Sequence, residues 1–214
     1  MHLQKVTQLK AILDVLQLAE KLKFELRHSW LSNGRQESVA EHTWRMSLMA
    51  VLLEPLLEHP VDMVKLLKMI IIHDLVEAEA GDVSVLDQIR NPEIKKIKIE
   101  NEKRAILKIR DMLSTSIGQE VYDLFYEFEE KQTYEAKVAN AIDKLEVQLQ
   151  HNHAELTTWE DIEYELSFVI AKHVEFDETI TLLKDLIEKQ AADKMEQAGR
   201  NVDEIRKRSE TLFK

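Results

Sequence analysis

Apolar residues recur every three or four positions along most of the chain, which is the spacing of helices that bury one face. This pattern predicts helices over roughly 4–25, 39–54, 61–80, 92–115, 118–131, 134–154, 158–176 and 178–212. No segment of convincing length shows the alternation typical of a β-strand, and the polar stretch 27–37 is interpreted as irregular. We therefore expect an all-α helical bundle over 1–177, with a C-terminal helical extension over 178–214 that packs on the same domain or projects from it.

Local signals support several of these boundaries. Ser38 followed three residues later by Glu41 is typical of a capping box at a helix start. Gly81 suits the end of a helix, because glycine tolerates the left-handed conformation found there. Asn91 before Pro92 predicts another helix start. Four glycines and three prolines in 214 residues also favour long helices joined by short loops.

Composition and charge narrow the function classes. The absence of cysteine excludes disulfides and thiolate metal ligands, and is compatible with a cytoplasmic location. Met1 leads directly into polar, amphipathic sequence, so no signal peptide is expected. No apolar run reaches the roughly 18–20 residues that a membrane span needs. The net charge of −11 argues against binding extended nucleic acid, although a metal and a few basic residues can still hold a small phosphorylated substrate.

The predicted helix 61–80 carries candidate chemistry near its end. His73 and Asp74 follow three isoleucines, where an imidazole and a carboxylate are costly to bury unless they are paired or bind a metal. Residues three and four apart share a helix face, so we expect Glu77 beside both of them. Asp82 follows the Gly81 cap and can reach the same pocket. A His-Asp dipeptide alone, however, is usually without significance.

Two further residues complete a pattern. His42 lies in the first turn of the helix that Ser38 caps, and Asp143 follows a small apolar stretch of the helix 134–154. Taken separately, His42 is more simply a core or solvated residue, and Asp143 is more simply an ion-pair partner of Lys144. Taken in chain order with His73 and Asp74, they form a set of nitrogen and oxygen donors that suits one divalent metal ion.

This order resembles the H…HD…D pattern of the HD-domain phosphohydrolase superfamily. Three stretches are similar to its 5′-deoxynucleotidase branch: Glu37-Ser38-Val39-Ala40-Glu41-His42, the run from His73-Asp74 through Glu77 to Asp82, and Asp143-Lys144-Leu145-Glu146. The resemblance covers about residues 5–175. It implies an HD-domain bundle that binds one divalent ion (Mn, Co, Fe, Zn or Mg) and hydrolyses nucleoside 5′-monophosphates.

The resemblance also implies a role for each matching residue. The metal ligands would be His42, His73, Asp74 and Asp143, and the acid–base pair would be Glu77 and Asp82. Arg27 would contact the phosphate, Lys144 would add a second positive charge, and Trp30 would crowd the sugar 2′ position. The plainer interpretation of Arg27 and Trp30 is an exposed arginine and a stacked or interface tryptophan, and the preference for deoxyribose stays open.

Other functions compete with this hypothesis. HD proteins also hydrolyse alarmones, nucleoside triphosphates and cyclic nucleotides; the two-metal cyclic-nucleotide enzymes need further histidines, and only His59 lies between His42 and His73. A non-catalytic module that binds metal or nucleotide is the alternative of another class. Relatives are commonly dimeric, so a homodimer is expected.

Overall fold

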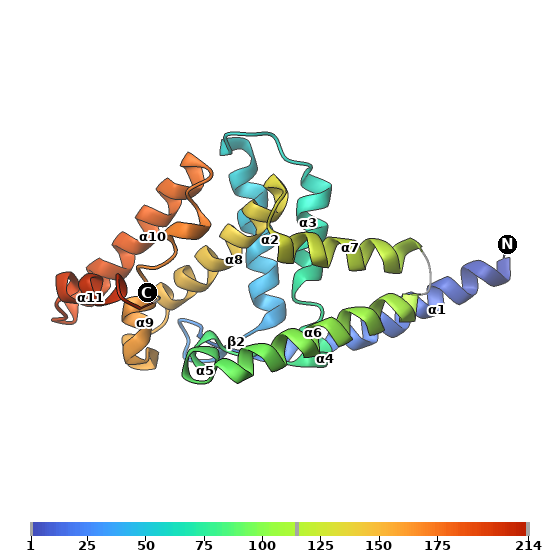
Figure 1. Ribbon diagram of the computed structural model, residues 1–214, viewed down its shortest axis with the longest axis horizontal. Coiled ribbons are helices and arrows are strands. Elements are labelled where there is room, and N and C mark those ends of the chain that lie inside the picture. Colours follow the sequence, from blue (N-terminus) through green and yellow to red (C-terminus); the bar gives the residue numbers. More distant parts are fainter. Residues whose placement is uncertain (1, 114–115, 213–214) are drawn as a thin grey trace.

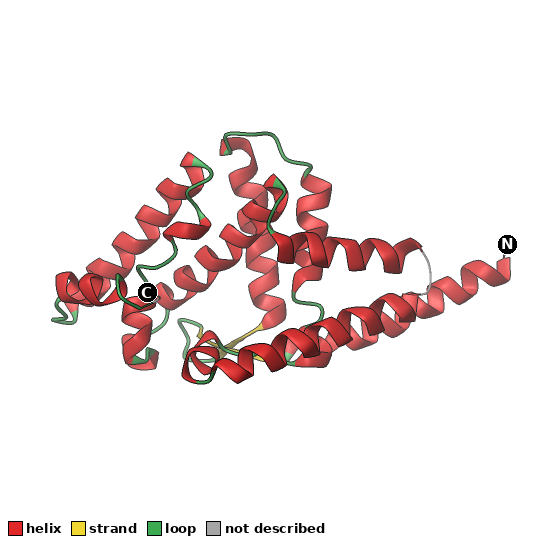
Figure 2. Cartoon of the chain, viewed as in Figure 1, coloured by secondary structure: helices red, strands yellow, loops and turns green. Residues whose placement is uncertain are grey.

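The computed structural model describes residues 2–113 and 116–212. Its longer helices are α1 (His2–Ala19), α2 (Val39–Leu53), α3 (Met63–His73), α6 (Pro92–Leu113), α7 (Ser116–Glu130), α8 (Tyr134–His153), α10 (Glu178–Gln197) and α11 (Val202–Ser209). Shorter elements are the helices α4 (Glu77–Ala80), α5 (Val85–Arg90) and α9 (Asp161–Leu166), the strands β1 (Leu26–Trp30) and β2 (Gln36–Ser38), and the 3-10 turns η1 (Glu20–Lys23), η2 (Glu54–Leu56), η3 (Leu156–Thr158) and η4 (Ala171–His173). Helices dominate, as Figure 2 shows, so the all-α prediction is confirmed.

Helix α8 occupies the centre of the fold and packs against α2, α3, α7 and α10 (Figure 1). Its small residues Ala136 and Ala139 let the neighbouring helices approach closely, and Ile142 and Leu145 are fully buried between them. Burying such apolar surface is the main favourable term of folding. A helix enclosed in this way holds its side chains in fixed positions, and Asp143 lies on it.

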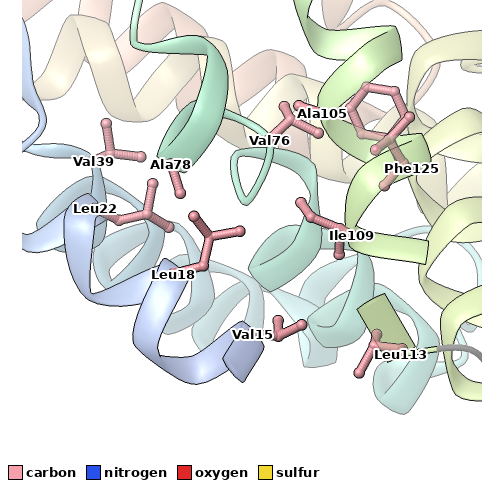
Figure 3. Packing of buried hydrophobic residues seen from close by; sticks show 11 residues of the cluster. Val15, Leu18, Leu22, Val39, Val76, Ala78, Ala105, Ile109, Leu113 and Phe125 are labelled. Atoms are coloured by element: carbon pink, nitrogen blue, oxygen red, sulfur yellow. The ribbon is translucent and has the colours of Figure 1, made fainter. Parts of the chain in front are cut away.

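Helices α1 and α6 run side by side along one edge of the molecule (Figure 1). Leu18 and Leu22 from the N-terminal segment pack with Ala78 of α4 and Ile109 of α6 in one cluster (Figure 3). This cluster fixes the short helix α4 against α6. The N-terminal part of α1 extends beyond it, so that Leu9 is 59% exposed.

The stretch 27–37 was expected to be irregular. It instead contains most of a two-stranded antiparallel sheet. Leu26 pairs with Ser38 and Trp30 with Gln36, and Gly34 turns the chain with a φ of 83°. The strands have only five and three residues, and β1 shows no clean alternation of buried and exposed positions. The hydrophobic pattern therefore could not reveal them.

The single helix predicted over 61–80 is divided in two. Helix α3 ends at His73, because Asp74 takes a ψ of 0° and its N–H bonds to the carbonyl of Ile72. Residues 74–76 form a turn, and α4 begins at Glu77, whose N–H donates to the carbonyl of Asp74 at 3.0 Å. Glu77 thus reaches the same region through a tight turn and not through the face of one continuous helix.

Other boundaries differ in the second half of the chain. The prediction of one helix over 158–176 is wrong, because the short helix α9 and two 3-10 turns, η3 and η4, occupy this region. Helix α5 was not predicted. The last helical region breaks at Gly199, which has a φ of 74° and separates α10 from α11. The predicted end of a helix at residue 115 lies outside the described residues. The capping box at Ser38 and Glu41 and the Gly81 cap are confirmed.

Helix α10 packs along α8, where Ile180 and Ile187 join Ala141 and Leu145 in one buried cluster. Over the described residues, no helix is long and apolar enough to cross a membrane.

Gly118 offers a test of the packing between α6 and α7. A Cβ atom at this position would lie 2.4 Å from the carbonyl oxygen of Arg110, which is backbone and cannot move aside. We expect Gly118→Ala to lower the free energy of unfolding by about 1–3 kcal/mol, measured by urea denaturation. Gln119→Ala, a change at the exposed neighbouring residue, is the control. Equal stabilities of the two variants would contradict this close approach.

Candidate metal centre

Four predicted ligands converge between three helices. Nε2 of His42 from α2 lies 3.2 Å from Oδ1 of Asp143 on α8 and 3.7 Å from Oδ2 of Asp74. Nε2 of His73, the last residue of α3, lies 3.0 Å from Oδ1 of Asp74. All four side chains are buried. Two imidazoles and two carboxylates that meet in this way match the donors of a divalent metal site.

The donor atoms themselves fit a metal ion. Within the described part of the chain, Nε2 of His42, Nε2 of His73 and Oδ2 of Asp74 are buried without a well-formed hydrogen bond. Buried polar atoms rarely stay unpaired in native proteins. Ligand atoms of His42, His73 and Asp143 also lie within 4.8 Å of one another. A single cation bound among them would satisfy these atoms together.

Each histidine is oriented by a partner on its other ring nitrogen. Nδ1 of His42 bonds to Glu146 of α8, and Nδ1 of His73 lies 2.7 Å from the carbonyl of Ile70. Both partners accept a hydrogen bond from Nδ1–H, so that in the neutral form of each ring the Nε2 lone pair is directed at the cluster. Arg45 in turn donates to Glu146 at 2.6 Å and holds that carboxylate. This arrangement of carboxylate and histidine is the support that metal-binding imidazoles commonly have.

The electric field of the cluster attracts positive charge. Burial lowers the pKa of His42, but Glu146 and Asp143 outweigh that effect and raise it to about 9. Burial raises the pKa of Asp143, yet Lys144 and His42 hold it well below its usual range. The pKa of Asp74 is likewise held well below its usual range, because His73, His42 and Arg27 outweigh its burial. An imidazolium at this point supplies the charge that a bound cation would bring.

Arg27 of β1 extends toward the same centre. Its NH1 atom lies 3.8 Å from Oδ2 of Asp74, and its Nε lies 3.6 Å from Oε2 of the buried Glu37. Nε of Arg27 is buried and has no hydrogen-bond partner among the described residues. The guanidinium therefore lies beside the cluster in ion pairs with two carboxylates, and its Nε makes no hydrogen bond with the described residues.

The predicted acid–base residues, Glu77 and Asp82, lie near both Asp74 and Arg27. Burial raises the pKa of Glu77 well above its usual value, and the carboxylates of Asp74 and Asp82 add to this rise. Burial also raises the pKa of Asp82. Glu77 is fully enclosed, with its Oε1 3.9 Å from Nζ of Lys98 on α6. A raised pKa favours the protonated form of a carboxyl group, which is the form that can donate a proton.

A cavity of about 210 Å³ lies beside Arg27 and Asp82. It is lined by Leu26, Arg27, His28, Gln36, Asp82, Ser84, Leu86, Asp87, Arg90 and Glu160. Trp30 is not one of its lining residues; its ring stacks edge-on against His28, with 4.9 Å between the centroids. Lys144 is also not a lining residue, and its Nζ is 2.7 Å from Oδ2 of Asp143. The structure therefore brings Arg27 and Asp82 to the cavity, but not Trp30 or Lys144.

Four important side chains received no role from the sequence. Glu37 and Glu146 stand inside two of the three motif segments that carry the family resemblance, so their positions could have been noticed. Arg45 stands one helical turn after His42, and that spacing was a usable signal. Lys98 lies in a run of charged residues on α6, and nothing local distinguishes it from its neighbours.

Comparisons with known proteins agree with this geometry. The family model of the HD domain matches residues 19–184 of this chain. The 5′-deoxynucleotidase HDDC2 of Dictyostelium discoideum is 35% identical over 145 residues, covering 64% of this chain and 74% of that protein. The human 5′-deoxynucleotidase HDDC2 is 28% identical over 157 residues, which cover 72% of this chain and 71% of the human protein.

Solved structures show the same fold. A predicted metal-dependent phosphohydrolase from Magnetospirillum magnetotacticum superposes with a TM-score of 0.73 at 25% identity, covering 91% of this chain and 98% of its own. A conserved hypothetical protein from Pyrococcus furiosus has a TM-score of 0.61 at 30% identity, and the match covers 83% of this chain and 98% of that protein. The chain belongs to the HD-domain family. Family and site together support a metal-dependent hydrolase.

Metal binding at this cluster should release a proton. His42 must lose its proton to act as a ligand, and its pKa of about 9 leaves it protonated at pH 7.5. We expect Mn²⁺ titrated into metal-stripped protein at pH 7.5 to release close to one proton, measured by calorimetry in buffers of different ionisation enthalpy. The apparent affinity should weaken by up to about tenfold per pH unit below pH 9, the direction required when protons compete with metal.

Two histidine variants test this prediction. His42→Ala should abolish both the tight binding of Mn²⁺ and the proton release. His59→Gln, a change at an exposed histidine, should leave both unaltered. Tight binding without proton release at pH 7.5 would contradict the role of His42 in this field.

Proposed function

We propose that the protein is a metal-dependent phosphomonoesterase that converts nucleoside 5′-monophosphates to nucleoside and phosphate. The observation that carries this proposal is the buried set of His42, His73, Asp74 and Asp143, flanked by Arg27 and the buried acid Glu77. The family match and the names of the related 5′-deoxynucleotidases support the substrate class.

In this proposal the four converging side chains hold one divalent ion, and Glu146 and the Ile70 carbonyl keep the two imidazoles aligned. When bound, such an ion lowers the pKa of water and polarises a phosphoryl group. The identity of the ion is left open between Mn, Co, Fe, Zn and Mg, since oxygen and nitrogen donors suit each of them.

The side chains of the protein supply the remaining chemistry. Arg27 binds the phosphate through its guanidinium group and stabilises the charge that spreads over the equatorial oxygens. The 5′ oxygen is a poor leaving group and needs a proton. Glu77 or Asp82 donates it, because both have raised pKa values. Lys144 adds positive charge from the side of Asp143.

The cavity beside Arg27 gives space for part of the nucleoside. Its lining is mostly polar and includes His28, whose ring touches Trp30. We propose that Trp30 influences the sugar site through this contact. A preference for deoxyribonucleotides follows the names of the relatives and is the first property to measure.

Three further proposals concern the whole molecule. A homodimer is supported by exposed apolar residues on α2, of which Trp44 and Leu52 are 65% and 64% exposed. A cytoplasmic location agrees with the lack of cysteine. The division at residue 177 separates a catalytic bundle from an extension that begins with α10, although α10 shares its buried cluster with α8.

Substrate and metal dependence are tested with metal-stripped protein. It is incubated with 5′-monophosphates, 3′-monophosphates and triphosphates in the presence of Mn²⁺, Co²⁺, Mg²⁺ or Zn²⁺, and released phosphate is measured. We expect phosphate from 5′-monophosphates only, and only with metal. Hydrolysis of another phosphoester instead would replace the substrate class, and nucleotide binding without turnover would favour a non-catalytic module.

The acid–base role is tested with Glu77→Gln. The amide keeps the shape of the side chain but cannot donate a proton as a carboxylic acid does, so kcat should fall by about 10²–10⁴-fold. Metal content and KM should change little. Glu79→Gln is a matched control, because Glu79 lies two residues further along α4, is exposed and pairs with Lys108. A variant at Glu77 with a near-normal rate would exclude the role.

A further inference from the structure

Lys98 forms an ion pair with the proposed proton donor, Glu77. It lies on α6, and its Nζ is 3.9 Å from Oε1 of Glu77. It also pairs with Glu102 one turn further along α6. Lys98 is four-fifths buried, unlike Lys103 of the same helix, which is half exposed and pairs with Glu100 on the surface.

The two oxygens of Glu77 have different surroundings. Oε1 faces Lys98, whereas Oε2 is buried and has no hydrogen-bond partner among the described residues. A carboxyl group that is held at one oxygen keeps the other in a defined direction. Without such a contact, the group rotates about its last bond, which is a soft torsion.

We propose that Lys98 is a positioning residue that holds Oε1 of Glu77 and thereby presents Oε2 to the leaving oxygen. This inference rests on the proposed function. In the step concerned, a bond forms between phosphorus and a water oxygen while the bond between phosphorus and the 5′ oxygen breaks. The proton on Oε2 passes to the 5′ oxygen, and the proton that the water loses restores Glu77.

The fold keeps Lys98 in place for this task. Helix α4 is fixed on α6 by the packing of Ala78 against the cluster that contains Ala105 and Ile109 (Figure 3). The distance between the backbones of Glu77 and Lys98 is therefore set by apolar contacts. Glu102 restrains the flexible lysine side chain from the other side. Small displacements of a catalytic group cost large factors in rate, so such restraint matters.

The experiment compares two substrates that differ in one atom. One is a 2′-deoxynucleoside 5′-monophosphate, and the other carries sulfur in place of the bridging 5′ oxygen. A thiolate leaves without being protonated, so the sulfur substrate does not need the proton from Glu77. The full-length variants are Lys98→Met, Lys98→Arg, Glu77→Gln and the double variant Glu77→Gln/Lys98→Met, with Lys103→Met as the control. Bound metal is measured in each by elemental analysis.

We expect Lys98→Met to lower kcat on the oxygen substrate by about 10–100-fold, with unchanged KM and metal content. On the sulfur substrate its loss should be about threefold or less. Lys98→Arg should recover most of the rate, because it keeps the charge. The double variant should be no slower than Glu77→Gln alone, and Lys103→Met should behave as the unaltered protein on both substrates.

Other results would overturn the inference. A normal rate for Lys98→Met, or equal losses on both substrates, would make Lys98 a structural residue. A raised KM with normal kcat would make it a substrate-binding residue. These outcomes leave the proposed function intact, provided that Glu77→Gln still discriminates between the substrates. Equal losses of Glu77→Gln on both would instead overturn the acid role of Glu77, and the inference with it.

Discussion

The collection of carboxylates in one buried region is the constraint on which the structure depends. Glu37, Asp74, Glu77, Asp82, Asp143 and Glu146 surround the candidate metal centre. Removing such charges from water costs several kcal/mol each unless they meet opposite charges or change protonation. Cations from separate elements form ion pairs with these carboxylates: Arg27 from β1, Arg45 from α2, Lys98 from α6 and Lys144 from α8. A bound divalent ion would complete this balance.

The two histidines are oriented by different means for the same purpose. A buried carboxylate of α8 fixes His42, and a backbone carbonyl within α3 fixes His73. The second arrangement depends only on local helix geometry. The first depends on α2 and α8 being held together, and Met46 of α2 and Ile142 of α8 are buried in the same apolar cluster. The alignment of His42 as a ligand therefore depends on the apolar packing between α2 and α8.

The carboxylates are divided into two groups by their surroundings. Neighbouring positive charges hold the pKa values of Asp74 and Asp143 low, so these groups stay ionised. Burial and nearby carboxylates raise the pKa of Glu77, and burial raises that of Asp82. Separated pKa values in one pocket are typical of sites where some acids bind cations and others transfer protons. The turn that ends α3 at Asp74 places one member of each group, Asp74 and Glu77, three residues apart.

Local sequence patterns determined much of this protein. The three-to-four-residue spacing of apolar side chains predicted most of the helices, and the capping box at Ser38 was correct because it involves neighbours along the chain. The motif order drew attention to His42, His73, Asp74 and Asp143, which the structure brings together. Short strands, the break after His73 and the region 158–176 were missed, because contacts with distant segments outweigh local preference there.

Only the tertiary structure decided which distant side chains meet. The bond between His42 and Glu146 joins residues 104 positions apart, and the contact between Glu77 and Lys98 joins two helices that the hydrophobic pattern did not place side by side. A charged residue looks the same in sequence whether it faces solvent or a buried carboxylate. The sequence by itself determined the helices and the residue types of the site; packing alone determined their partners, because burial and proximity are properties of the folded chain.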